Sequence, residues 1–235
     1  MKDGRREIGR ADAAADWFSA LDLAVDLPAG QDRDDLITHT ARQWAAKAPA
    51  AAADWAAQIA DPVLRERLIS DIATAWAESD PSAAAAWAMK SLTPGKPQDD
   101  ALVSVAQRWT QQQPEAAAVW VTEFPAGTLR DTALEEVVKL WTDQNIEAAG
   151  KWLGALGLGS VRDVAVGAYV TRIAPQFPAV AARWAKDIQD ESLRVRELET
   201  VGESWLASNP AAARTWITQS ALPEPAKTRL LAAGN

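Results

Sequence analysis

Acidic side chains are the first candidates for chemistry in this sequence. Asp32, Asp34 and Asp35 form a D-x-D-D motif, a spacing that occurs in catalytic sites of other all-helical proteins. Asp99 and Asp100 occupy the equivalent place in a later part of the chain, so the motif belongs to a recurring pattern. Acidic residues in the first turn of a helix interact favourably with the helix dipole. We therefore interpret these carboxylates as helix-start residues and expect no catalytic residue among them.

Other residue types that support catalysis or metal binding are scarce. His39 is the only histidine, and the chain contains no cysteine. A transition-metal site needs several nitrogen or sulfur ligands, and a Ser-His-acid triad needs an oriented histidine. His39 is predicted to lie on the polar side of a helix, away from the apolar stripe that includes Ile37. We expect no metal ion, no cofactor and no catalytic residue.

A tryptophan repeat organises the chain. Trp109 and Trp120 enclose the sequence W-x4-P-x-A-A-x-x-W, and this motif recurs with a period of 32 residues and, once, 33. The first position of the motif is occupied by Trp44, Trp76, Trp109, Trp141, Ile173 and Trp205, and the second by Trp55, Trp87, Trp120, Trp152, Trp184 and Trp216. A period in this range indicates stacked structural repeats. Both columns lie on predicted apolar stripes, so we expect core packing; a platform on which ligands stack is the alternative.

Each repeat is predicted to be a helical hairpin. Before Trp109, the apolar residues Leu102, Val105 and Ala106 follow the i, i+3, i+4, i+7 spacing of an amphipathic helix. A proline such as Pro114 then opens a second helix, where its missing N–H group is not needed. One hairpin cannot bury two indoles alone, so neighbouring hairpins must stack.

The expected fold is all-α, an α–α superhelix (solenoid) of about six and a half hairpins. It forms a single domain over 11–235, and residues 1–10 are expected to be frayed. The predicted repeats lie near 33–62, 65–94, 98–126, 130–158, 162–190 and 194–222, with half-repeats at 11–30 and 223–235. Half-repeats at both ends favour a segment of a longer array.

Arginine recurs 11 residues before the first tryptophan position of the motif. The column consists of Arg33, Arg65, Arg130, Arg162 and Arg194, with Gln98 in the third repeat. A side chain at this place could reach the C-terminal carbonyl groups of a neighbouring helix. We predict a structural ladder that joins stacked repeats.

The fifth repeat departs from the pattern. Its first helix, 161–174, is apolar almost all round, and Ile173 replaces the tryptophan. A helix of this kind is either buried on every side or presents a docking surface. We predict a docking patch at Val166, Tyr169 and Val170.

Charge and hydropathy exclude several classes of partner. The net charge of −8 is unfavourable for a nucleic-acid binder, which needs a basic face. No stretch is long and apolar enough for a transmembrane helix, and the N-terminus lacks the apolar core of a signal peptide. We expect a soluble protein, cytoplasmic or periplasmic after processing; the compartment and the oligomeric state stay open.

Two segments resemble known helical repeats. The segments 129-LRDTALEEVVKLW-141 and 80-DPSAAAAW-87 are similar to HEAT-type repeats in the Asp-Pro turn and in the early arginine, here Arg65 and Arg130. They are similar to tetratricopeptide repeats in the alanine-to-aromatic pair from Ala83 to Trp87. The resemblance implies a bacterial α-solenoid, a right-handed α–α superhelix that scaffolds protein partners, and it brings no catalytic residues.

We therefore expect a non-catalytic scaffold that binds a protein or peptide on its concave surface. One alternative is a closed helical toroid that binds or processes a glycan or terpenoid in a tryptophan-lined pocket. Such a pocket needs convergent carboxylates that break the repeat, and we identify none in the sequence. Another alternative is a structural segment of a longer array with no ligand of its own.

Overall fold

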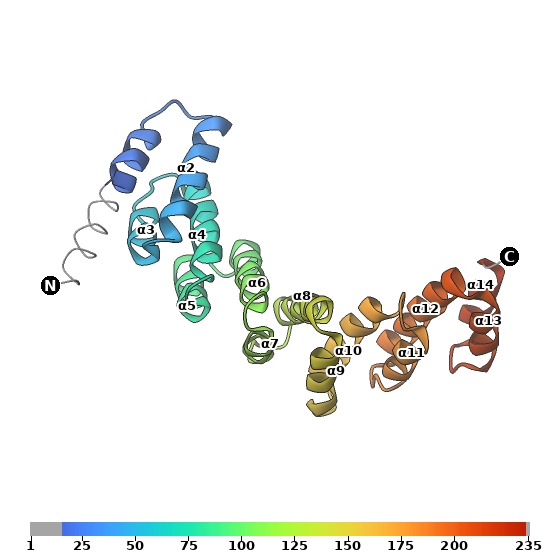
Figure 1. Ribbon diagram of the computed structural model, residues 1–235. Helices are drawn as coiled ribbons and strands as arrows, with labels where there is room; N and C mark the ends of the chain where they lie inside the picture. Colours follow the sequence, from blue (N-terminus) through green and yellow to red (C-terminus); the bar gives the residue numbers. More distant parts are fainter. Residues whose placement is uncertain (1–15, 234–235) are drawn as a thin grey trace. The chain divides into compact units, whose positions relative to one another are not determined.

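The computed structural model describes residues 16–233, and these residues form helices and short connections with no strand among them. The predicted all-α class is confirmed, and helices that follow one another along the chain pack together (Figure 1). The packing divides the chain into two compact units, with unit 1 ending at Trp109 and unit 2 beginning at Thr110. The frayed segment predicted for 1–10 lies outside the described residues.

In the described part of unit 1, residues 16–25 are helical, and helical hairpins follow them. Its further helices are α2 (Gln31–Ala45), α3 (Pro49–Ala56), α4 (Pro62–Trp76), α5 (Pro81–Ser91) and α6 (Lys96–Thr110), whose last residue belongs to unit 2. The longer helix α4 packs against α2 of the preceding repeat and against both short helices, α3 and α5.

Unit 2 repeats this alternation of longer and shorter helices. They are α7 (Pro114–Thr122), α8 (Thr128–Gln144), α9 (Ile146–Ala155), α10 (Ser160–Ile173), α11 (Pro178–Lys186), α12 (Glu191–Ser208), α13 (Pro210–Gln219) and α14 (Glu224–Ala233). Helix α10 packs against α8 on one side and α12 on the other. The long helices of successive repeats are thus neighbours, which determines where the candidate site forms.

Local sequence explains where the short helices start. Proline occupies the first turn of α3, α5, α7, α11 and α13, where no helical partner exists for an N–H group. In α5 the Asp80 side chain accepts the N–H of Ala83, and in α13 Asn209 accepts that of Ala212. In α9, where Ile146 replaces proline, the Asn145 side chain caps the helix. These caps satisfy backbone donors that a helix start leaves unpaired.

Paired aromatic rings join the two helices of a hairpin. The ring centroids are 6.3 Å apart for Trp44–Trp55, 6.0 Å for Trp76–Trp87, 5.6 Å for Trp141–Trp152 and 5.5 Å for Trp205–Trp216. Trp44, Trp55 and Trp141 are buried, and the other tryptophans of the two columns are half-buried. The rings pack at tilted angles, as aromatic pairs in protein cores prefer.

The arginine column makes two kinds of contact. Arg65 donates to the carbonyl of Ile59, and Arg194 to those of Ile188 and Gln189, so both hold the connection that follows the preceding short helix. Gln98 makes the equivalent contacts to the carbonyls of Met89 and Leu92. Arg162 reaches the carbonyl of Asp187 at the end of α11, whereas Arg33 and Arg130 pair with the next residue, Asp34 and Asp131. The column therefore serves hairpin connections, with a different partner from repeat to repeat.

Candidate functional site

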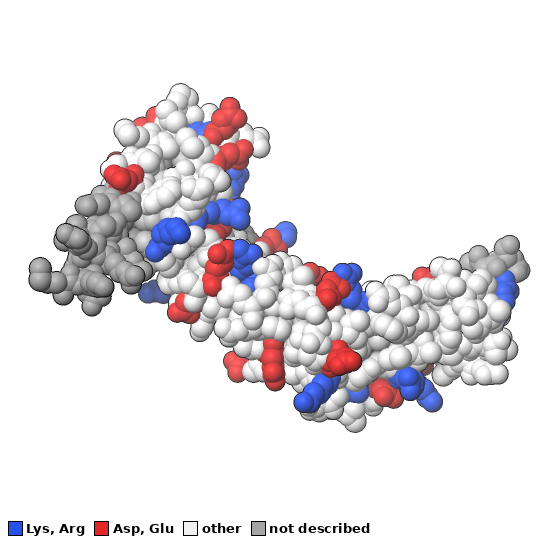
Figure 2. All heavy atoms as spheres, in the orientation of Figure 1, with Lys and Arg blue, Asp and Glu red and all other residues white. Residues whose placement is uncertain are grey.

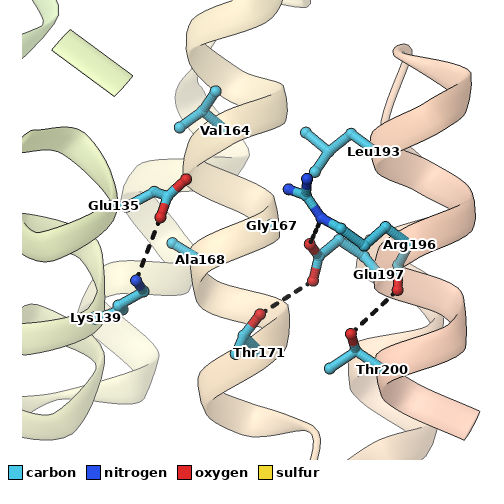
Figure 3. A pocket seen from close by; sticks show the side chains of 10 residues that line it. All are labelled: Glu135, Lys139, Val164, Gly167, Ala168, Thr171, Leu193, Arg196, Glu197 and Thr200. Carbon is cyan, nitrogen blue, oxygen red and sulfur yellow. Dashed lines mark hydrogen bonds and ion pairs between the residues drawn. The ribbon is translucent and has the colours of Figure 1, made fainter. Parts of the chain in front are cut away.

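A hollow of about 250 Å³ lies over helix α10, between α8 and α12 (Figure 3). Its lining comes from these three long helices of consecutive repeats and belongs entirely to unit 2. The residues are Glu135, Lys139, Val164, Gly167, Ala168, Thr171, Leu193, Arg196, Glu197 and Thr200. We define this group as the α10 hollow.

The floor of the α10 hollow is one face of α10. Val164, Gly167, Ala168 and Thr171 follow the i, i+3, i+4, i+7 spacing and therefore point to the same side of the helix. The position of Gly167 is occupied in the other repeats by Thr38, Ser70, Val103, Glu135 and Glu199. The position of Ala168 is occupied by His39, Asp71, Ser104, Glu136 and Thr200. Helix α10 thus has small residues at two adjacent places where the other repeats mostly have larger ones, and this opens the hollow.

The wall formed by α8 carries a shared positive charge. The ammonium group of Lys139 lies 3.3 Å from a carboxylate oxygen of Glu135 and 3.3 Å from one of Glu136. All three side chains are partly exposed. One cation therefore contacts two carboxylates on this side.

The wall formed by α12 carries a buried carboxylate. Glu197 is only 4% exposed. The hydroxyl of Thr171 donates to its Oε2 atom at 3.0 Å, and Nε of Arg196 donates to its Oε1 atom at 3.2 Å. The Arg196 side chain itself is 67% exposed. Figure 3 shows the carboxylate between α10 and α12, with the guanidinium and hydroxyl groups on either side of it.

Glu197 breaks a column of the repeat that is otherwise apolar. The equivalent positions, eight residues before the first tryptophan position, hold Leu36, Leu68, Ala101, Ala133 and Ala165. Our search of the sequence for carboxylates that break the repeat missed this residue. Comparing the residues at this repeat position is enough to identify Glu197 as an exception, because it is the only charged residue among them.

The docking patch expected at Val166, Tyr169 and Val170 is not formed. These residues are 0%, 4% and 0% exposed, because α10 is covered on those sides by its neighbouring helices. The face of α10 that lines the hollow is exposed at Thr171 and half-buried at Val164, whereas Gly167 and Ala168 are buried. The almost wholly apolar sequence of α10 therefore reflects burial and not a docking surface.

Tyr169 has a packing role in the fifth repeat. Its ring contacts Trp184 edge-on at 5.6 Å between centroids, and so supplies the ring that Ile173 lacks. Its hydroxyl donates to the carbonyl of Ile146 at 3.2 Å. Burial raises the pKa of the Tyr169 phenol above its ordinary value, which strengthens the preference for the protonated, donating form.

A second, more open depression of about 440 Å³ lies between α4 and α6 in unit 1. Its lining is Val63, Glu66, Arg67, Ser70, Asp71, Lys96, Pro97 and Asp100. Most of these side chains are exposed, and Lys96 pairs with Asp100 on the surface. Burial raises the pKa of the Asp71 carboxyl, against the opposing effect of Arg42 and Arg67. The α10 hollow is the stronger candidate because it contains a buried charge.

The chemical groups of the α10 hollow suit hydrogen bonding and ion pairing. It offers carboxylates, cationic groups and hydroxyls around a small apolar floor. On the face drawn in Figure 2, acidic and basic side chains are interspersed. Within 16–233, no group of three acidic or histidine side chains is placed to hold a metal ion.

Comparison with known proteins gives no relative from which a function could be transferred. No family model, no curated protein and no solved structure matches this chain. Across the described helices, none is long and apolar enough to cross a bilayer. The HEAT-like or tetratricopeptide-like subfamily and the right hand of the superhelix therefore remain predictions.

Proposed function

We propose that this protein is a non-catalytic helical-repeat scaffold that binds a segment of a protein or peptide. In this proposal, a side chain of the bound segment enters the α10 hollow. The observation that carries the proposal is the coincidence of Gly167, Ala168 and Glu197. Together they break the repeat at one place, whereas the residues that join the hairpins largely keep it.

The size of the hollow supports a side chain as the occupant. Pockets for small-molecule ligands and cofactors usually exceed about 300 Å³, and the α10 hollow is about 250 Å³. A partner would cover the hollow and extend over the long helices on both sides. The tilted ring pairs Trp141–Trp152 and Trp205–Trp216 stiffen the hairpins that supply its two walls.

A displayed library of random peptides tests the proposal. The library is selected on the wild-type chain and counter-selected on Gly167→Val, which places the side chain found at Val103 into the floor. A β-carbon at Gly167 would make ordinary contacts with the end of Leu193, at 3.4 Å, and with the Glu197 side chain, at 3.6 Å, so the methyl groups of valine fill the floor beside these two side chains. Thr38→Val is the control, because it places the same valine side chain at the same repeat position in unit 1.

We expect peptides that bind the wild type and Thr38→Val and lose at least about tenfold in affinity on Gly167→Val. Circular dichroism establishes that all three chains are equally helical. If no peptide is enriched, or if the enriched peptides bind Gly167→Val equally well, the scaffold function at this hollow is wrong.

A further inference from the structure

We infer that the side chain that enters the α10 hollow is an arginine of the partner, paired with the carboxylate of Glu197. This inference rests on the proposed function and adds the chemistry of the occupant. It starts from the energetics of Glu197. A buried carboxylate is unfavourable unless it is paired and hydrogen-bonded.

The partners within the chain leave Glu197 incompletely paired. Thr171 and Arg196 each donate one hydrogen bond, one to each carboxylate oxygen. A carboxylate has about four acceptor positions, so about two remain. An ion pair to a largely exposed arginine contributes little because water screens it. Glu197 therefore retains capacity for a second cation.

The position of the charges in the hollow also favours a cation. The lining holds two carboxylates, Glu135 and Glu197, and two cationic groups, Lys139 and Arg196. Lys139 lies against Glu135, whereas the cationic group beside the buried Glu197 is largely exposed. An apolar side chain over Glu197 would bury its carboxylate further without a new hydrogen bond.

The shape of the hollow suits arginine better than lysine. Val164 and Leu193 offer apolar surface for the methylene groups of a long side chain. The planar guanidinium group of an arginine has five N–H donors and can contact a carboxylate through two parallel hydrogen bonds, whereas an ammonium is a point charge.

The direct test is an NMR titration of the isotope-labelled chain with N-acetyl-L-arginine amide. The parallel probes are N-acetyl-L-lysine amide and N-acetyl-L-citrulline amide, which is uncharged but similar in shape. We expect shifts at backbone amides of α10 and α12 with the arginine probe. The shifts should be weaker with lysine and at least about tenfold weaker with citrulline.

Glu197→Gln keeps the shape and an acceptor for Thr171 but removes the charge. We expect this variant to lose the arginine shifts, while Thr38→Val retains them. The inference is overturned if the arginine probe shifts no amide of α10 or α12, if citrulline is equivalent, or if Glu197→Gln binds as the wild type does.

Failure of this inference is distinguishable from failure of the scaffold function. Peptides selected on the wild type and lost on Gly167→Val would keep the scaffold function. If their affinity is then unaffected by arginine-to-citrulline replacement and by Glu197→Gln, only the arginine chemistry is wrong.

Discussion

The hydroxyl of Tyr169 occupies the space beside Gly150 that a β-carbon would need. A β-carbon built on Gly150 would lie 2.8 Å from this oxygen and 3.4 Å from the ring carbon that bears it. The other repeats hold Ala53, Ala85, Ala118, Ala182 or Arg214 at the position of Gly150. The absence of a side chain at Gly150 is therefore matched to the ring that Tyr169 supplies in place of a tryptophan.

Gly150→Ala should lower the free energy of unfolding by about 1–2 kcal/mol. The Tyr169 ring must shift, and the hydrogen bond from its hydroxyl to the carbonyl of Ile146 weakens. In a Tyr169→Phe background the same change should be neutral or stabilising, because the oxygen is gone and alanine favours helices over glycine by about 1 kcal/mol. Denaturant unfolding of the four chains measures the coupling. Additive effects would show that the two residues are independent.

The hairpins could be predicted from the sequence because the spacings that indicate them are local. An 11-residue spacing between Trp141 and Trp152 spans one turn between two helices, and the rings pair in the structure. The compensation by Tyr169 was not predictable in this way. It depends on the ring of Tyr169, one helical turn before Ile173, and on the missing β-carbon of Gly150 in the preceding repeat. The repeat period does not relate these two positions.

The candidate site was predictable only in part. Comparing repeat columns identifies Glu197 and Gly167 as exceptions. The hollow itself depends on how side chains of α8, α10 and α12 fill the space between helices about 30 residues apart, which is a property of packing. The expected patch at Val166 was wrong for the same reason, because hydrophobicity alone does not show which side of a helix its neighbours cover.

Substitutions at Arg194, a member of the arginine column, test whether its hydrogen bonds or its positive charge stabilise the chain. Arg194→Ala should destabilise the chain by about 1–2 kcal/mol, because the carbonyls of Ile188 and Gln189 lose their donor. Arg194→Gln should recover most of this loss, since Gln98 makes the equivalent contacts with its amide. Thermal unfolding with the exposed Arg183→Ala as control measures both. Equal losses for glutamine and alanine would show that the positive charge is what matters.

Asp71 gives a prediction with a defined pH dependence. Its pKa is raised by burial, so the folded state binds this proton more tightly than the unfolded state does, and ionisation of Asp71 lowers stability. Asp71→Asn should therefore raise the free energy of unfolding at neutral pH. The gain should shrink as the pH falls through the raised pKa and vanish below the ordinary carboxyl range.

Urea unfolding of Asp71→Asn and wild type between pH 7 and about pH 3 measures this difference. Asp54→Asn, at an exposed position of α3, is the control. A gain that is constant over the whole range would mean that the effect of Asp71→Asn does not come from proton binding. A loss of stability at neutral pH would mean that the ion pair with Arg42, at 3.8 Å, outweighs burial.

Glu197 should contribute little or negatively to stability if its role is binding. Ala101, Ala133 and Ala165 fill the same repeat position and are buried there without difficulty. Glu197→Ala removes a buried charge whose main counter-ion is exposed, and Thr171, which is itself exposed, can exchange its hydrogen bond for water. We expect the free energy of unfolding to rise by about 0.5–2 kcal/mol while binding at the hollow is lost, the trade-off typical of functional residues. Denaturant unfolding measures the first effect, with Glu203→Ala at an exposed position of α12 as a surface control. A loss of more than about 1 kcal/mol would instead identify Glu197 as a structural residue that joins α10 to α12.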